Sequence, residues 1–271
     1  MTQAEDNFIA LFDKFLNDKV GEVSKYEYIR VVKKFMDSAK GQTTEEQFKQ
    51  TLTEFLNIDN VNTYRNTLAA LKKLFEFIGQ PQTIESFKYK AVMPTFNIAT
   101  PSLEEMLTFG KAIENKRVQA FYYLGIVSAI RPEHMLRLKK GLFDKNNNMI
   151  NTWMKEFSNK NFFFSFYTQD SKAYIEKYLA TITDNNVLFP IGKRYIIKQF
   201  DKASIKTGIK ITPKTMRKFT TNWLRRHGMI SEDVDAITSH TPQTIVAKHY
   251  MDVSRIHEEY DRAMQDIKLN L

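Results

Sequence analysis

The spacing of apolar residues is the feature that most constrains how this chain can fold. In most of the sequence these residues recur every three or four positions, as do Phe8, Leu11 and Phe12 near the start. This period is typical of amphipathic helices that bury one face. Within residues 142–168 the period shortens to two, which is typical of β-strands. The pattern therefore predicts a mainly helical fold with a small antiparallel β-sheet.

The sheet is predicted to contain two or three strands. Residues 144–148 read Asp-Lys-Asn-Asn-Asn, a typical turn sequence, and alternating segments follow at 149–154 and 162–167. Helical spacing resumes after the sheet. We expect helices there at about 170–181, 194–206, 213–227, 232–238 and 242–250.

A stretch without periodicity divides the chain into two parts. Residues 88–101 follow neither period and contain two prolines, so we place an interdomain linker there. Residues 1–87 should form a bundle of four or five short helices. Residues 102–271 form the second predicted domain, in which helices surround the small sheet.

Short local signals mark where some helices begin and end. Thr43 with Glu46, and Ser102 with Glu105, have the spacing of capping boxes, which predicts a helix start at each place. Gly79 follows a helical segment and precedes a proline by two positions, which predicts a helix end.

The net charge indicates a polyanionic partner. Residues 1–98 contain 13 basic and 13 acidic residues, so the remaining 27 basic and 18 acidic residues carry the whole charge of +9. Charge alone does not separate DNA from RNA or from an anionic membrane surface. No apolar run approaches the roughly 20 residues that span a bilayer, the start of the chain lacks a signal-peptide pattern, and there is no cysteine. We therefore expect a cytoplasmic protein with no membrane partner.

Familiar catalytic motifs are absent from the sequence. It has no glycine-rich phosphate loop, no GxSxG elbow and no HExxH helix, and its five histidines have no persuasive metal-ligand spacing. The reactive residue types that remain are Arg, Lys, His and Tyr. These suffice for phosphoryl transfer through a covalent tyrosine, so we expect no metal site and no cofactor.

Two arginines lie in settings that suit phosphate binding. Arg131 precedes Pro132, so it should stand at the start of a helix whose first residue is that proline. Thr212 and Pro213 mark another helix start, which puts Lys214 and Arg217 on one helix face. Guanidinium groups can hold the oxygens of a phosphodiester in two parallel charged hydrogen bonds. Taken singly, each arginine is more commonly a surface or salt-bridged residue.

A third segment contains a histidine and a tyrosine. His240 lies just before Thr241-Pro242, another predicted helix start, and Tyr250 follows on that helix. A lone tyrosine on a helix is ordinarily a half-buried packing residue.

Together and in this order, the three segments resemble the signature of the tyrosine recombinase family. That signature has an Arg before a helix, a Lys on a β-hairpin, a His/Lys-x-x-Arg helix, a Leu-Gly-His-like segment and a Tyr nine or ten residues later. Arg131, Lys214 with Arg217, His240 and Tyr250 match it. The match covers essentially the whole chain. In its spacing and small size the chain looks most similar to integrases of archaeal viruses.

The resemblance implies a role for each matched residue. Tyr250 is the nucleophile, Arg131 and Arg217 hold the non-bridging oxygens, and His240 and Lys214 assist them. The hairpin lysine that protonates the leaving oxygen is Lys160, with Lys155 as the alternative. Two supporting positions depart from the family: His134 stands where Glu is frequent, and Lys218 replaces the usual His after the second Arg. These departures put the orientation of the arginines in doubt more than the chemistry.

The resemblance also implies an architecture and an assembly. Residues 1–87 would be a helical core-binding domain and residues 102–271 an α+β catalytic domain, with double-stranded DNA between them. Recombination through a 3′-phosphotyrosyl intermediate and a Holliday junction, as in viral genome integration, would need a homotetramer on paired DNA sites, formed from monomers. A type IB topoisomerase-like enzyme and an inactive DNA-binding remnant of the fold remain as alternatives.

Further lysines are candidates for DNA contacts. The candidates are Lys33, Lys34, Lys72, Lys73, Lys155 and Lys218. Doublets of this kind more often form the solvated face of an amphipathic helix.

The tail after Tyr250 should form one more helix. It is expected to start near Ser254, with an apolar stripe formed by Ile256, Tyr260, Ala263, Met264 and Ile267. Such a stripe must be buried, either on the same protomer or on a neighbouring one. Tails of similar recombinases dock on a neighbouring protomer, so we predict docking in trans.

Overall fold

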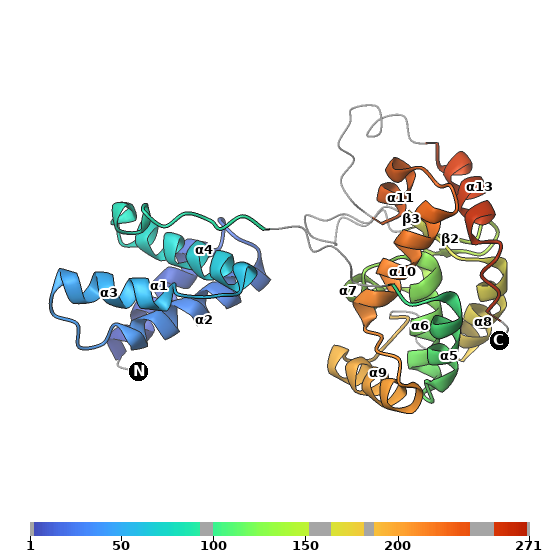
Figure 1. Cartoon of the computed structure of the whole chain (residues 1–271), viewed down its shortest axis with the longest axis horizontal. Helices are drawn as coiled ribbons and strands as arrows, with labels where there is room; N and C mark the ends of the chain where they lie inside the picture. The colour runs from blue at the N-terminus through green and yellow to red at the C-terminus, as the bar shows by residue number, and fades with distance from the viewer. Residues whose placement is uncertain (1–2, 93–99, 152–163, 182–186, 239–251, 270–271) are drawn as a thin grey trace. The chain divides into compact units, whose positions relative to one another are not determined.

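The computed structural model describes residues 3–92, 100–151, 164–181, 187–238 and 252–269. The chain divides into two compact units, residues 1–97 and 98–271, and Figure 1 labels most of their helices and strands. Each unit has its own hydrophobic core. They are described here one at a time.

The first unit is a bundle of helices, as the apolar spacing predicts. Its elements are α1 (Gln3–Leu16), α2 (Glu22–Ser38), α3 (Glu45–Phe55), α4 (Val61–Phe77) and a short 3-10 helix, η1 (Pro81–Ile84). The fully buried side chains come from the apolar stripes of these helices, and include Phe12, Leu16, Val32, Leu68 and Phe75.

The predicted capping box of α3 is wrong by one residue. The Thr44 side chain, rather than that of Thr43, accepts a hydrogen bond from the Gln47 backbone N–H, and the Gln47 side chain caps the Thr44 N–H in return. Two adjacent threonines fit the sequence pattern equally well. Gln47 Oε1 also accepts the Thr43 N–H at 3.1 Å, so one glutamine satisfies both backbone donors.

The first residues of the predicted linker are attached to α4. The Tyr64 hydroxyl donates to the Lys88 carbonyl at 2.9 Å, and Arg65 donates to the Lys90 carbonyl at 2.8 Å. The Tyr89 ring lies beneath Arg65 and Lys72. The backbone at 88–90 therefore packs as part of the first unit.

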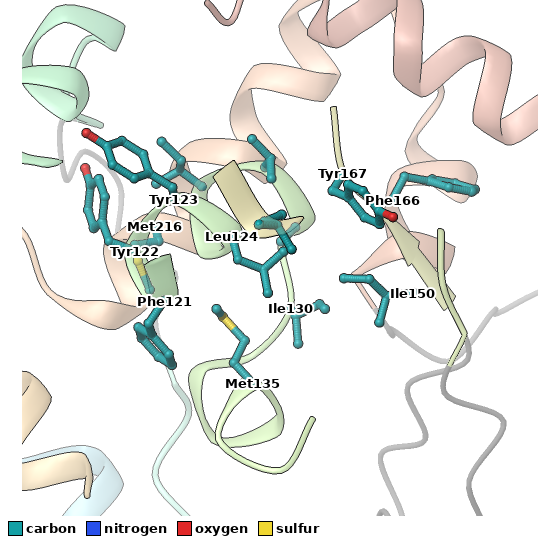
Figure 2. Close-up of a cluster of buried hydrophobic side chains, with 14 of the residues drawn as sticks. Phe121, Tyr122, Tyr123, Leu124, Ile130, Met135, Ile150, Phe166, Tyr167 and Met216 are labelled. Carbon is teal, nitrogen blue, oxygen red and sulfur yellow. The ribbon is translucent and has the colours of Figure 1, made fainter. Parts of the chain in front are cut away.

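The second unit surrounds one central buried helix. Its elements are α5 (Leu103–Ala112), α6 (Lys116–Ser128), α7 (Pro132–Met135), η2 (Lys140–Leu142), β1 (Phe143–Asp144), β2 (Met149–Asn151), β3 (Phe164–Phe166), α8 (Gln169–Ala180), α9 (Lys193–Thr207), α10 (Pro213–Arg226), α11 (Ser231–Ile237) and α13 (Val253–Met264). Every residue of α6 from Val118 to Ser128 is buried. Figure 2 shows Phe121, Tyr122, Tyr123 and Leu124 of α6 in one cluster with Met216 of α10, Met135 of α7, and Ile150 and Phe166 of the sheet. The predicted capping box of Ser102 and Glu105 begins α5.

The sheet is antiparallel, with strand order β1-β2-β3, as the shortened period predicts. Asp144 pairs with Met149 across a turn in which the Asp144 carboxylate accepts the N–H groups of Asn146 and Asn147. Asn148 has a φ of 47°, a left-handed conformation that asparagine tolerates well. The rest of the predicted strands, at 152–154 and 162–163, lies outside the described residues.

The tail helix α13 packs on its own unit, which is the cis arrangement of the two that the sequence allows. Its N-cap is Asp252, and its apolar stripe is buried. The Tyr260 hydroxyl donates to the Val127 carbonyl of α6 at 2.9 Å, and Trp223 Nε1 of α10 donates to the Ala263 carbonyl at 2.9 Å. Arg255 pairs with Asp233 of α11 at 2.8 Å. Burial against α6 and α10 satisfies the stripe within one chain.

Candidate active site

The helix that carries Arg217 is fixed against the central helix by close packing. A Cβ atom on Gly125 of α6 would lie 2.7 Å from the end of the Met216 side chain, so this side chain of α10 packs directly against the glycine. One turn along, the Thr220 hydroxyl donates to the Ile126 carbonyl at 2.8 Å. These contacts set the position of Arg217 relative to the end of α6.

The Arg217 guanidinium joins two backbone segments. Its Nη1 donates to the Ala129 carbonyl at 3.0 Å, and its Nη2 donates to the Thr238 carbonyl. Ala129 ends α6 with a φ of 53° and lies two positions before Arg131. Burial, helped by the charge of Arg131, lowers the pKa of Arg217 to about 10, so the group remains a cation at neutral pH.

Arg131 stands where its proline neighbour predicts. It is the N-cap of α7, in extended conformation, with Pro132 as the first helical residue. Its carbonyl accepts the backbone N–H groups of His134 and Met135 at 2.9 and 3.0 Å, which holds the backbone at this position. Burial lowers the pKa of the half-buried Arg131 side chain.

Arg131, Lys214 and Arg217 line one cavity of about 480 Å³. The cavity lies between the start of α7, the start of α9 and the first turn of α10. Because Arg131 also affects the pKa of Arg217, the two guanidinium groups are electrostatic neighbours. Three cationic side chains that line one cavity can bind an anion with several oxygen atoms.

Sequence reasoning missed one basic residue of this cavity. Lys193, the first residue of α9, also lines it, and its Nζ lies 3.4 Å from the Glu133 carboxylate. Gly192-Lys193 at a helix start was the only available signal. Only the packing of α9 beside α7 brings this lysine to the arginines.

His134 is a neutral neighbour of the arginines. Burial, together with the positive charges of Arg131, Arg137 and Arg217, lowers its pKa to about 4. An imidazolium here would repel the arginines, whereas the neutral ring does not. The departure from the family pattern at this position is therefore compatible with an intact arginine cluster.

Four predicted site residues lie outside the described residues. They are Lys155, Lys160, His240 and Tyr250. The described chain stops before this last pair at Thr238, whose carbonyl accepts from Arg217, and resumes at Asp252, the N-cap of α13. Thr238 and Asp252, the described residues on either side of this pair, thus both belong to the second unit.

The other candidate lysines have varied surroundings. Lys73 pairs with Glu76 at 2.7 Å, and the Lys72 Nζ lies 4.7 Å from the centre of the Tyr89 ring. Lys34 is exposed, whereas Lys33 and Lys218 are half-buried. Their contact with DNA stays a prediction.

Metal sites and membrane-spanning helices are absent from the described residues. No group of three or more His, Asp or Glu side chains is arranged to hold a metal ion there. Within the same ranges, no helix has the length and apolarity needed to cross a membrane.

Comparison with known proteins reveals similarity in structure. No family model matches the sequence, and no curated protein does. Among solved structures, a lambda integrase (75–356) dimer bound to a COC′ core site has a TM-score of 0.68 at 13% identity, covering 92% of this chain and 96% of that chain. The Tn1549 transposon integrase in complex with circular intermediate DNA has a TM-score of 0.62 at 15% identity, with coverages of 93% and 98%.

A third neighbour is the XerH site-specific recombinase bound to difH substrate in a pre-cleavage complex. It has a TM-score of 0.59 at 16% identity, covering 87% of this chain and 77% of that chain. The structural neighbours are thus tyrosine recombinases and integrases. At these identities the similarity establishes the fold, which is a helical domain plus the α+β fold of the recombinase catalytic domain.

Proposed function

We propose that this protein is a site-specific DNA recombinase that cuts and rejoins DNA through a covalent 3′-phosphotyrosyl intermediate. One observation carries the proposal: Arg131, Lys214 and Arg217 line a single cavity in a chain with the recombinase fold. Structural neighbours described as bound to DNA support double-stranded DNA as the partner.

The chemistry follows from the charges that strand cleavage creates. In the transition state, negative charge builds on the non-bridging oxygens of the phosphodiester, and Arg131 and Arg217 would hold these oxygens. The Tyr250 oxygen would lose its proton to solvent and bond to phosphorus while the bond to the 5′-oxygen breaks. Lys160 would give that oxygen its proton, and His240 and Lys214 would assist the arginines.

Rejoining would reverse the same step. The 5′-hydroxyl of a partner strand attacks the phosphotyrosine, so the phosphodiester is restored and Tyr250 is released. No nucleotide hydrolysis is required, because the bond energy is kept in the covalent intermediate. Two such exchanges on paired DNA sites would pass through a four-way junction, within a homotetramer assembled from monomers. The proposal includes integration of a viral genome as the biological role of the protein. It also includes action inside the cell.

The covalent intermediate provides the decisive test. The full chain is incubated with DNA substrates that carry a nick next to candidate cleavage sites, so that the cleaved end diffuses away and the adduct accumulates. Tyr250→Phe should bind DNA like the parent and form no adduct. Tyr26→Phe, which alters an exposed tyrosine of the first unit, is the matched control and should retain the adduct.

The products also distinguish the alternatives. An adduct that persists in Tyr250→Phe would remove the central claim. Relaxation of supercoiled DNA without junction or recombinant products would indicate a topoisomerase. DNA binding by the parent without any adduct would indicate an inactive remnant. The same assay in EDTA tests the expectation that cleavage needs no metal ion.

The general acid is tested with a modified leaving group. A 5′-sulfur at the scissile bond needs little protonation, so this substrate should restore cleavage by Lys160→Ala. It should not restore cleavage by Arg131→Ala, whose defect lies in phosphate binding. Rescue of Lys155→Ala in place of Lys160→Ala would show that the other hairpin lysine is the acid.

A further inference from the structure

A second and larger cavity lies on the other side of α6. Its volume is about 1320 Å³, and α5, α6 and α8 line it. It shares no lining residue with the arginine cavity. On α6, Phe121 faces the arginine cavity, whereas Gln119 and Tyr123 line this one, as residues two positions apart on a helix point to different sides.

The Tyr123 hydroxyl is the strongest sign that this cavity holds a ligand. The residue is 0% exposed, and its hydroxyl has no hydrogen-bond partner in the described part of the chain. Figure 2 shows the hydroxyl at the end of the ring that points away from the hydrophobic cluster. Burial raises the pKa of Tyr123 to about 12, so the hydroxyl keeps its proton and can donate. A buried donor without an acceptor is costly, and a bound acceptor would remove that cost.

Gln119 is a hydrogen-bonded polar residue that lines the cavity together with Tyr123. Its Nε2 donates to the Gly110 carbonyl at 2.9 Å. Its Oε1 accepts from both Lys116 Nζ and the Tyr174 hydroxyl, each at 3.1 Å. The Gln119 amide is therefore hydrogen-bonded at both its nitrogen and its oxygen. These bonds also fix the Lys116 and Tyr174 side chains at the cavity wall.

The wall of the cavity is predominantly basic. Lys111, Lys116, Arg117 and Lys177 line it, with Asp170 as the acidic residue among the lining side chains. Lys116 and Arg117 form the first turn of α6, a 13-residue helix whose N-terminal dipole also favours negative charge. The cavity thus favours an anionic ligand.

The same wall carries aromatic rings. The Tyr123 and Tyr174 rings meet edge to face at 5.3 Å, and Tyr178 stacks on Phe189 at 5.5 Å. Tyr174 and Tyr178 are half-buried, and both contribute aromatic surface to the lining of the cavity. Such surfaces bind planar rings.

We propose that this cavity binds a nucleoside phosphate. The phosphate lies against the lysines and Arg117, and the base lies against the tyrosines and accepts a hydrogen bond from the Tyr123 hydroxyl. The volume exceeds what one such ligand needs, because drug-sized ligands occupy pockets of roughly 300–1,000 Å³. The site is separate from the proposed strand-transfer site.

Equilibrium binding to the full chain tests the proposal in the absence of DNA. A fluorescent ATP analogue is titrated into the protein, and unlabelled ATP, AMP, adenosine, inorganic phosphate and a short single-stranded oligonucleotide are used as competitors. ATP and AMP should compete more strongly than either adenosine or phosphate alone, because each of these lacks half of the recognised groups.

Three variants relate binding to the cavity. Tyr123→Phe removes only the hydroxyl and should weaken binding about tenfold, as expected for one buried hydrogen bond. Lys116→Gln combined with Arg117→Gln should weaken ATP more than adenosine. Lys198→Gln removes an exposed lysine of α9 outside the cavity and should bind like the parent. Circular dichroism and thermal unfolding show whether each variant is folded.

Several results would overturn the proposal. The first is the absence of saturable binding at millimolar ATP, and the second is an unchanged affinity in both cavity variants. The third is competition by phosphate as strong as that by ATP, and the fourth is stronger competition by the oligonucleotide than by ATP. The last two would indicate a simple anion site or a nucleic-acid strand. Because no DNA is cleaved in this assay, its outcome is independent of the proposed recombinase activity.

Discussion

Arg217→Lys separates the two things that this arginine does in the structure. The guanidinium donates to the Ala129 carbonyl at the end of α6 and to the Thr238 carbonyl at the end of α11. In the proposed function it also holds a phosphate oxygen. Lysine keeps the positive charge but has one nitrogen atom on a flexible stem, so it cannot reproduce the fork.

The expected loss of stability follows from these hydrogen bonds. A hydrogen bond from a charged donor contributes about 1.5–3 kcal/mol, and a lysine ammonium can keep at most one of the two with good geometry. We therefore expect Arg217→Lys to lower the free energy of unfolding by about 2–3 kcal/mol. For a domain of this size that corresponds to about 4–12 °C in Tm. Cleavage should fall by about two to three orders of magnitude, as for loss of an oriented donor to transition-state charge.

The assay combines thermal unfolding with adduct formation on the nicked substrate. Arg226→Lys is the matched control, because Arg226 lies in the last turn of the same helix and is exposed. Its free energy of unfolding should change by less than about 0.5 kcal/mol, and its adduct yield should match that of the parent. Equal melting temperatures for the two variants would refute the joining role of Arg217. Normal cleavage by Arg217→Lys would refute its catalytic role.

Two further predictions concern the tail and His134. Truncation after Ser254 removes the buried apolar stripe of α13, in which each large side chain contributes about 1.5–3 kcal/mol to stability. The second unit should therefore unfold and lose its protection from proteolysis. A truncated protein with the parent's melting temperature would contradict the packing in cis. The folded-state pKa of His134 lies near 4, below its ordinary value of about 6.5, so the parent should lose about 2–3 kcal/mol of stability as the pH falls from 6.5 to 4 and none from this group above 6.5. His134→Gln should lose less than the parent over that range in denaturant titrations, and parallel pH curves for the two proteins would show that the imidazole does not titrate this way.

Local signals in the sequence determined much of the secondary structure. The apolar period predicted the helical first unit, helices α8, α9, α10 and α11, and the short sheet between α7 and α8, because side-chain periodicity follows directly from helix and strand geometry. The expected helix at 242–250 lies outside the described residues. The proline after Arg131 and the Thr212-Pro213 pair placed two helix starts correctly, since proline fixes its own φ and restricts the residue before it. Errors arose where two neighbouring residues fit one signal, as at Thr43 and Thr44.

Only the tertiary structure shows how side chains that are distant in sequence come to line one cavity. Arg131 and Arg217 lie on helices far apart in sequence, and the close contact at Gly125 together with the Thr220 hydrogen bond brings them to one cavity. Lys193 reaches the same cavity only because α9 packs nearby, which no local pattern encodes.

The tail shows the same division between sequence and structure. The spacing of Ile256, Tyr260 and Ile267 required an apolar surface to cover the helix, but it held no information on which chain provides that surface. The structure provides it from α6 and α10 of the same unit, where the Val127 carbonyl accepts from Tyr260. Periodicity is a property of a segment, whereas its partner depends on distant residues that packing brings together.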